Sequence, residues 1–236
     1  MERLSQETHR EAENRRYFDR WSKHYDDGRI SRWFQYTQEL TIRLLDLKPN
    51  SKVLDVGCGT GHAVLRLASI VSDGKACGID VSPGMVEKAS SKVPQDLKGI
   101  VEFVQASSEE IPYTKGYFNQ VLCTNSFHHY PDPLQALREM RRVLKPGGQI
   151  VIFENAPDLS WYTWIWDRIL RVAETGHVRY YCSWEIGQML TQAGFENVRL
   201  RHLGNECLKH GKIFASIQVW SGKVPREKSK VKLAIE

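Results

Sequence analysis

A glycine-rich turn is the strongest chemical signal in this sequence. Gly57, Gly59 and Gly61 follow the short apolar run Val53–Val56 and precede a segment with helical periodicity. Glycines at such a corner let a ligand approach the backbone closely. Asp80 ends the next apolar run, where a carboxylate can accept hydrogen bonds from both hydroxyls of a ribose. The pattern predicts a nucleoside-binding site at the ends of two strands.

The position of Asp55 helps to decide which of two kinds of nucleotide ligand the site would bind. The glycines are spaced GxGxG, whereas the dinucleotide fingerprint is GxGxxG and places a pyrophosphate at a helix N-terminus. A carboxylate two residues before the first glycine would repel a pyrophosphate but attract the amino group or sulfonium of an amino-acid tail. The spacing therefore favours an adenosine with a cationic tail. An NAD-dependent oxidoreductase is the alternative on fold grounds.

At these residues the sequence resembles the class I S-adenosylmethionine-dependent methyltransferases of the type 11 group, which includes quinone-biosynthesis and natural-product enzymes. The resemblance runs from about Tyr17 to Trp220 and is densest from Val53 to Gly148. It implies S-adenosyl-L-methionine as the cofactor. The family commonly has Asp where this chain has Ser107, so the bond to the adenine amino group would lack charge assistance. The implied cofactor-binding residues are Tyr25, Asp55, Gly57, Cys58, Gly59, Gly61, Asp80, Val81, Met85, Ser107, Ser108 and Asn125.

Alternating elements from Lys52 onward predict the scaffold that positions this site. Short runs rich in Val and Ile alternate with helical segments, which is typical of a mostly parallel sheet with helices on both faces. The runs Val198–His202 and Ile213–Trp220 lie close enough for a hairpin. The resemblance implies a Rossmann-like α/β fold with seven strands, the last one antiparallel.

The other segments are expected to form a lid, a cap and a tail around this one domain. Residues 1–50 carry an amphipathic helical pattern and would form an N-terminal lid of the same domain, with a second helix over Phe34–Leu47. Residues 51–221 would form the methyltransferase domain, with a helical cap at about 156–183 between the fifth and sixth strands. Residues 222–236 would form a basic tail.

His128 and His129 are candidate general bases, and the resemblance places them where the fourth strand leaves the sheet. An imidazole titrates near neutral pH and suits that role. Methyl transfer from a sulfonium is an in-line displacement with an activated leaving group, so a base matters only when the acceptor must lose a proton. The alternative is a hydrogen-bonded structural pair that closes a strand–helix turn.

The aromatic residues of the expected cap predict a pocket for the methyl acceptor. Three tryptophans lie within six residues, and two tyrosines follow. We expect Trp161, Trp164, Tyr180 and Tyr181 to line a pocket for a small aromatic, lipophilic or cationic acceptor. Two alternatives stay open: a lid that buries these rings on itself, and an interfacial patch that touches a membrane weakly together with the basic tail.

Composition excludes several classes of function. The chain has 236 residues, 41% hydrophobic and 26% charged, which suits one globular core. It has no run of ~18 apolar residues, no apolar leader, and five cysteines without a CxxC pair, so we expect a cytoplasmic protein without disulfides or metal. Residues 223–232 carry five cations and one acid, 5 − 1 = +4 of the net charge of +5, which makes nucleic acid an unlikely partner.

These observations together predict a function. We expect an S-adenosylmethionine-dependent methyltransferase (EC 2.1.1.-) that acts on a small molecule and has no obligate protein partner. The alternative is a non-catalytic S-adenosylmethionine-binding regulatory or scaffold protein.

Overall fold

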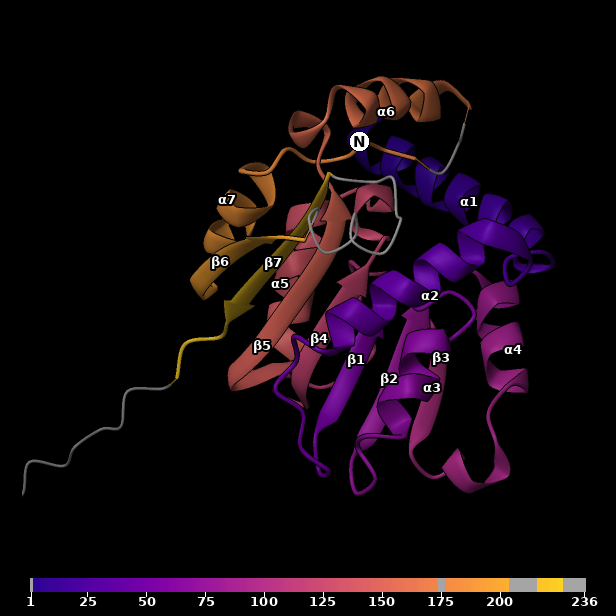
Figure 1. Cartoon of the computed structure of the whole chain (residues 1–236), viewed down its shortest axis with the longest axis vertical. Helices are drawn as coiled ribbons and strands as arrows, with labels where there is room; N and C mark the ends of the chain where they lie inside the picture. The colour runs from indigo at the N-terminus through magenta and orange to yellow at the C-terminus, as the bar shows by residue number, and fades with distance from the viewer. Residues whose placement is uncertain (1, 174–176, 204–215, 227–236) are drawn as a thin grey trace, which may run out of the picture.

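Seven strands form one sheet, and helices cover both of its faces (Figure 1). The computed structural model describes residues 2–173, 177–203 and 216–226. The strand order β3-β2-β1-β4-β5-β7-β6 confirms the expected Rossmann-like α/β architecture. The strands are β1 (Lys52–Val56), β2 (Lys75–Asp80), β3 (Val101–Gln105), β4 (Phe118–Thr124), β5 (Leu144–Asn155), β6 (Glu196–His202) and β7 (Ile217–Lys223).

The last strand runs against the others, as expected. β7 pairs antiparallel with both β5 and β6, whereas the pairs among β1 to β5 are parallel. The predicted start of this strand at Ile213 falls in residues 204–215, which lie outside the described residues. β7 extends to Lys223, and Val224 still exchanges backbone hydrogen bonds with Gly147 and Gly148. The sheet therefore continues past the expected domain end at residue 221, and residues 227–236 of the expected tail are outside the description.

Helices connect the strands and extend over the sheet. They are α1 (Glu2–Ser22), α2 (Gly28–Ile42), α3 (His62–Ala68), α4 (Pro83–Ser91), α5 (Pro133–Val143), α6 (Trp161–Ala173) and α7 (Glu185–Gln192). Short 3-10 turns are η1 (Gln95–Leu97), η2 (Phe127–His129) and η3 (Pro157–Leu159).

The second lid helix begins and ends earlier than the predicted range Phe34–Leu47. Gly28 has a φ of +92° and turns the chain out of the α1–α2 connection. At the other end, the N–H groups of Leu44 and Leu45 bond to carbonyls three residues back, which tightens the last turn and stops the helix.

Alternating side chains on the central strands build a core on each face of the sheet. Leu54 and Ile152 belong to the core covered by α5 and α7, whereas Val53, Leu122 and Phe153 belong to the core covered by α2 and α3. All five side chains are fully buried. Strands covered on both faces have apolar residues at successive positions, which explains the continuous apolar runs in the sequence.

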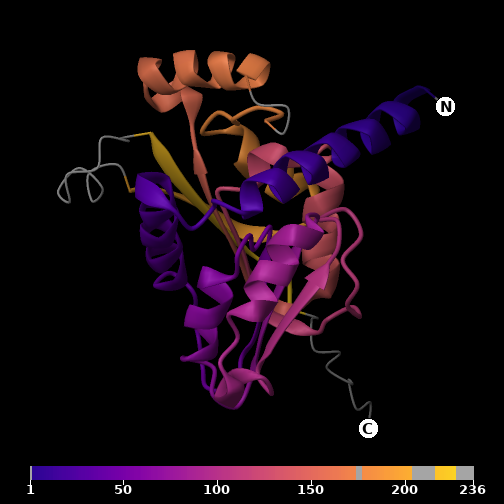
Figure 2. The ribbon, with the colours of Figure 1, turned by 90° about the vertical axis from the view of Figure 1, so that its right-hand side faces the viewer.

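The lid and the cap lie at the same end of the molecule. In both views α1 and α6 sit beyond the ends of the parallel strands (Figures 1 and 2). In a parallel sheet that end carries the strand-to-helix corners, where ligands bind. The predicted cap at about 156–183 contains η3, α6 and an irregular segment, of which residues 174–176 lie outside the description.

Candidate cofactor and acceptor site

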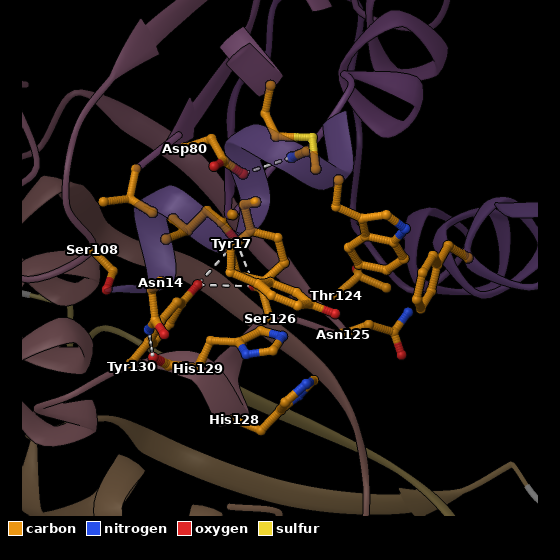
Figure 3. Close-up of a pocket in the computed structure, with 18 of the residues that line it drawn as sticks. Asn14, Tyr17, Asp80, Ser108, Thr124, Asn125, Ser126, His128, His129 and Tyr130 are labelled. Atoms are coloured by element: carbon orange, nitrogen blue, oxygen red, sulfur yellow. Dashed lines mark hydrogen bonds between the residues drawn. The ribbon is translucent and has the colours of Figure 1, made fainter. Parts of the chain in front are cut away.

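A cavity of about 310 Å³ lies where the lid and the cap meet the strand ends. At one end it is lined by Gly57, Gly59 and Asp80. At the other end it is lined by His128 and His129. Figure 3 shows Asp80, His128 and His129 around this one cavity. The volume is within the range of sites that bind cofactor-sized molecules.

The glycine loop adopts a backbone that other residues would strain. Gly57, Gly59 and Gly61 have φ angles of +74°, +52° and +84°. A Cβ at Gly57 would lie 2.5 Å from Ser126, and one at Gly61 would lie 2.5 Å from the Phe103 ring. The loop is therefore pressed against neighbouring side chains. Gly57 and Gly61 are required by both conformation and space, and Gly59 by its positive φ.

Asp80 holds the loop in place through both carboxylate oxygens. Its Oδ2 accepts the Gly59 N–H at 2.9 Å, and its Oδ1 accepts the Ser82 N–H at 2.9 Å. Ser82 caps α4 by accepting the Met85 N–H at 3.1 Å, with Pro83 at the first helical position. The carboxylate predicted to bind ribose is thus fixed at the cavity wall by β2, α4 and the glycine loop.

Two buried acids make this end of the cavity attractive to a cation. Burial and the neighbouring Asp80 raise the pKa of Asp55 to about 8. Burial also raises the pKa of Asp80 to about 6, although backbone N–H bonds from Ser82 and Gly59 oppose the rise. A nearby positive charge would favour the ionised form of both acids. Such an arrangement suits an amino or sulfonium group, as the sequence predicts.

Three of the predicted cofactor residues lie beneath the cavity surface. Asp55, Cys58 and Gly61 do not contribute to its lining, whereas Gly57, Gly59, Val81 and the other predicted positions do. Burial raises the pKa of the Cys58 thiol well above its usual range, so this side chain packs as a small apolar group.

A carboxylate that the sequence analysis missed stands beside Ser107. Glu109 Oε2 accepts hydrogen bonds from the hydroxyls of Ser107 and Ser108 at 2.5 and 3.0 Å. All three residues line the cavity. Glu109, two residues further along the chain, therefore places an acidic group beside Ser107, the position where the resemblance leads one to expect an Asp. The acidic residue that follows Ser107 and Ser108 in the sequence is the signal by which this carboxylate could have been predicted.

The lid is fastened to the glycine loop by its interhelical turn. Asp26 accepts a hydrogen bond from the Thr60 hydroxyl at 2.6 Å and forms an ion pair with Lys92 at 2.6 Å. The adjacent Tyr25 places its hydroxyl 3.4 Å from the position of a Cβ on Gly59, and its ring stacks on Phe34. Burial raises the pKa of Tyr25, so its hydroxyl stays protonated. Tyr25 is thus positioned over the glycine loop.

His128 and His129 lie together on η2, at the end of β4. The two rings are 3.9 Å apart, and Figure 3 shows them side by side at the cavity wall. His128 Nδ1 lies 2.5 Å from Oε2 of Glu154 on β5. The His129 ring packs edge-on against Phe18 of the lid at 4.9 Å. Both histidines face the cavity that their position in the sequence predicts.

A second imidazole–carboxylate pair comes from the cap. Asp167 on α6 accepts a hydrogen bond from His177 Nε2 at 2.9 Å and from the Tyr180 N–H at 2.7 Å. Burial raises the pKa of Asp167, but these bonds and Arg171 outweigh it and lower the pKa to about 2. The rings of His177 and Tyr180 pack within 5.2 Å of the His128 ring. The cap and the sheet thus meet in one polar cluster.

The predicted acceptor residues occupy different places. Tyr180 lines the cavity. Tyr181 lies in the core and packs against Phe127 at 5.3 Å. The side chains of Trp161 and Trp164 are 75% and 52% exposed and do not line the cavity.

The rotation of α6 about its own axis explains where its tryptophans lie. Its inner face carries the buried Thr163 and Asp167, and Trp166 and Leu170, four residues apart, reach the cavity. Trp161 and Trp164 therefore fall on the outer face. The burial of two polar residues set the rotation of the helix, which aromatic content alone could not show.

Metal binding and membrane spanning find no support in the described part of the chain. There, no group of three or more His, Cys, Asp or Glu side chains is arranged to hold a metal ion. None of the helices described is both long enough and apolar enough to cross a membrane.

The fold is a Rossmann-like α/β sheet with a cavity at the ends of its parallel strands, as in methyltransferases of known structure. Residues 54–152 match the family described as "Methyltransferase domain". Over 117 residues the chain is 38% identical to a demethylmenaquinone methyltransferase of Bacillus mycoides, with 49% of each chain covered. The chain spans about half the length of the curated relatives it matches. Over this region the chain is thus similar to methyltransferases of the type 11 family, and the similarity implies S-adenosylmethionine as the cofactor.

Solved structures extend the similarity to most of the fold. A SAM-dependent methyltransferase from Aquifex aeolicus has a TM-score of 0.66 and 25% identity, covering 87% of this chain and 98% of that chain. A chain from the complex of the Haloferax volcanii Trm112 methyltransferase activator with a methyltransferase has a TM-score of 0.75 at 19% identity. That match covers 89% of this chain and 98% of the other, and shows a shared fold.

Proposed function

We propose that this protein is an S-adenosylmethionine-dependent methyltransferase whose acceptor is a small, lipophilic molecule with an aromatic ring. One observation carries the proposal: a single cavity joins Asp80 and the glycine loop to an end lined by histidine and tryptophan rings. Relatives named for demethylmenaquinone support a ring of the quinol type among such acceptors.

The cofactor end offers a matching group for each part of the ligand. Asp80 would accept hydrogen bonds from the ribose hydroxyls, and Val81 and Met85 would pack on the adenine. Glu109 would accept a hydrogen bond from the adenine amino group, in place of the acid that the family usually has at position 107. The negative charge of Glu109 would strengthen this bond. Asp55 would stabilise the positive amino-acid half from beneath the loop. The remaining proposed contacts are Tyr25, Gly57, Gly59, Ser107, Ser108 and Asn125, whereas Cys58 and Gly61 would support the loop from beneath.

The chain's own contribution to the reaction is alignment and exclusion of water. The bound cofactor would supply a methyl group on a sulfonium, which is already a good leaving group. Trp21 and Tyr25 of the lid and Trp166 of the cap line the cavity from above, so the acceptor would be held in line and shielded from water. His128 and His129 are the groups placed to accept a proton from the acceptor.

Calorimetry and turnover test this proposal separately. We expect S-adenosylhomocysteine to bind and NADH not to bind, and Asp80→Asn to weaken S-adenosylhomocysteine binding by about 10-fold or more, the effect of losing charged hydrogen bonds. We then expect label transfer from methyl-labelled S-adenosylmethionine to a member of a panel of hydroquinones, phenols, amines and thiols. Tight NADH binding without S-adenosylhomocysteine binding would overturn the cofactor assignment.

A non-catalytic S-adenosylmethionine-binding protein is the second candidate. It would bind S-adenosylhomocysteine as the enzyme does but would transfer no label to any acceptor class. The ring-lined end of the cavity favours the enzyme, because a binding protein needs no second compartment beside the cofactor. A cytoplasmic location stays a prediction from the sequence.

We also propose that the outer face of α6 rests on a lipid surface. Trp161, Trp164, Ile165 and Ile169 expose 75%, 52%, 41% and 47% of their surface, and Arg168 lies over the Trp164 ring at 4.9 Å. Such a mixture of indole, aliphatic and arginine side chains suits the boundary between headgroups and acyl chains. The same helix lines the cavity on its inner side, so a lipophilic acceptor could pass directly from the lipid.

Co-sedimentation with vesicles containing anionic lipid tests this contact with the full chain. We expect the protein to pellet with vesicles and Trp161→Ser/Trp164→Ser to stay in the supernatant. Ile70→Ser removes an exposed apolar side chain from the turn after α3 and should bind like the parent. If the parent does not pellet, or forms a dimer that the double variant loses, the face is not a lipid contact.

A further inference from the structure

A buried carboxylate supports the histidine end of the cavity. Glu154 on β5 is fully buried, and its Oε2 accepts the backbone N–H of His128 at 3.2 Å and lies 2.5 Å from Nδ1 of the same residue. Its Oε1 has no hydrogen-bond partner among the described residues. A buried carboxylate with an unsatisfied oxygen is costly, so it calls for a functional reason.

The contacts of His128 leave one edge of its ring for a ligand. Nδ1 faces Glu154, and the ring is enclosed by His129 at 3.9 Å, Tyr180 at 4.8 Å and His177 at 5.2 Å. His128 lines the cavity whereas Glu154 does not. The Nε2 edge is therefore the part of this pair that an acceptor can reach.

Burial shifts the pKa values of His128 and Glu154 in opposite directions. It lowers the pKa of His128, because a proton on the ring would create a buried cation. It raises the pKa of Glu154, because the carboxylate is a buried anion. An isolated buried imidazole would thus be a poor proton acceptor. Beside an ionised Glu154, however, the same proton uptake removes a buried charge instead of creating one, so burial now favours it.

We propose that His128 and Glu154 act as one proton-accepting unit, with His128 as the catalytic base and Glu154 as its positioning residue, and that the acceptor is an aromatic hydroxyl compound. This inference rests on the proposed methyltransferase function. The acceptor oxygen, or the ring carbon conjugated with it, forms the new bond to the methyl carbon. The bond from that carbon to sulfur breaks, and its electron pair stays on sulfur. The hydroxyl proton passes to Nε2 of His128, which is needed for a phenol or hydroquinone but not for a thiolate or carboxylate.

Other titratable groups surround the pair but are placed differently. They are His129 on η2, Cys123 on β4, Asp167 on α6, and His177, Tyr180 and Tyr181 after α6. Asp167 has a pKa of about 2 and is paired with Arg171 at 2.6 Å, so it keeps its charge in the working range. Burial raises the pKa of Cys123 to about 12 and helps to raise that of Tyr181 to about 12. His128 lines the cavity and is paired with the buried Glu154, so a proton taken from the cavity would be shared by this pair.

An NMR titration tests the pair without requiring activity. The probe is the ring Cε1–H signal of His128 in the full-length protein saturated with S-adenosylhomocysteine. We expect the midpoint of its titration to fall by at least one pH unit in Glu154→Gln, because the neutral amide no longer stabilises the proton on the pair. An equal midpoint in the parent and in Glu154→Gln would overturn the proposal, whatever the activity of the protein.

Kinetics with an aromatic hydroxyl acceptor such as 1,4-dihydroxynaphthalene give a second test. We expect Glu154→Gln to lower kcat at least 100-fold with S-adenosylmethionine KM within about 3-fold, and to move the acid limb of the kcat profile to lower pH. Glu154→Asp should recover part of kcat. Glu139→Gln is the matched control, since Glu139 also accepts a backbone N–H and pairs with Arg142 but lies on α5 away from the cavity. It should retain kcat and the pH profile.

Two outcomes separate this inference from the proposed function. If the parent transfers methyl groups but Glu154→Gln keeps both kcat and the acid limb, the pair is structural and only this inference fails. If the parent transfers no methyl group, the proposed function fails, and the NMR midpoints still decide whether the pair shares a proton. Should Glu154→Gln not fold, His128→Gln takes its place: a loss of less than 10-fold in kcat would overturn the role of His128.

Discussion

Asp26, in the turn between the two lid helices, accepts a hydrogen bond of 2.6 Å from the hydroxyl of Thr60, inside the glycine loop. The residues are 34 positions apart in the chain, yet this bond and the ion pair of Asp26 with Lys92 join the lid to the cofactor end of the cavity. A bound cofactor would lie under a lid whose fastening point is the loop that binds it.

Loosening this fastening should speed the release of ligand. We expect Asp26→Asn to raise the dissociation rate of S-adenosylhomocysteine about 5-fold, since a partly exposed ion pair contributes up to about 1 kcal/mol. Deuterium uptake in the segment 12–26 should rise as well. Asp27→Asn removes a neighbouring carboxylate that is 76% exposed, and it should change neither quantity. Equal effects of the two substitutions would show that Asp26 does not fasten the lid.

The close packing of Gly61 predicts a large loss of stability on substitution. Gly61→Ala would place a Cβ 2.5 Å from Phe103 and 2.9 Å from Ala89, at a φ of +84°. We expect the free energy of unfolding to fall by about 3 kcal/mol, measured by urea denaturation. Gly99→Ala meets no atom within 4 Å and should stay within about 0.5 kcal/mol of the parent. A loss below about 1 kcal/mol for Gly61→Ala would contradict this account of the loop.

The raised pKa values of Asp55 and Asp80 predict that binding releases protons. Near neutral pH Asp55, with a pKa of about 8, is largely protonated in the free protein. An ammonium group favours the carboxylate, so the affinity for S-adenosylhomocysteine should rise as the pH increases from 6 to 8. Calorimetry in buffers of different ionisation enthalpy should detect the released proton.

Adenosine is the matched control for that experiment, because it has the ribose and adenine but no ammonium group. Its affinity should depend much less on pH over the same range. The Asp55→Asn variant should bind S-adenosylhomocysteine with a shallower pH dependence than the parent. Identical slopes for the two ligands in the parent would exclude Asp55 as the partner of the amino-acid half.

Asp167 predicts where the protein loses stability in acid. Its pKa is about 2 in the folded chain, against 3.8 as the ordinary value, so its contribution is present above pH 4 and is lost as the pH falls towards 2. This shift corresponds to about 2 kcal/mol. Urea denaturation should therefore show Asp167→Asn to be about 2 kcal/mol less stable than the parent at pH 7, with a smaller difference at pH 3. A difference that does not narrow in acid would assign the loss to packing.

Local sequence predicted the fold and the cofactor end because both depend on neighbouring residues. The Val- and Ile-rich runs predicted strands buried on both faces, and the glycines predicted a corner with positive φ. Asp80 was predictable because it ends a strand, and its carboxylate accepts the N–H of Ser82 only two residues along the chain.

The acceptor end was less predictable because its contacts join distant segments. Glu154 and His128 come from different strand ends, and nothing in an apolar β5 indicates that its one acid faces a histidine. The rotation of α6 depends on Asp167 meeting His177, which cannot be read from the tryptophans. Sequence therefore identified the histidines but missed the carboxylates that hold them.

The pairing of Asn155 with Ile217 closes a long excursion of the chain. These residues are register partners on β5 and β7, and the Ala156 N–H donates to the Ser216 carbonyl at 2.7 Å just beyond them. The segment between these two residues contains α6, α7 and the edge strand β6, while the glycine loop and Asp80 belong to earlier strands. Exchange of this whole segment, cap included, between relatives could thus diversify the range of molecules methylated, because its two ends are paired and the nucleoside half is left intact.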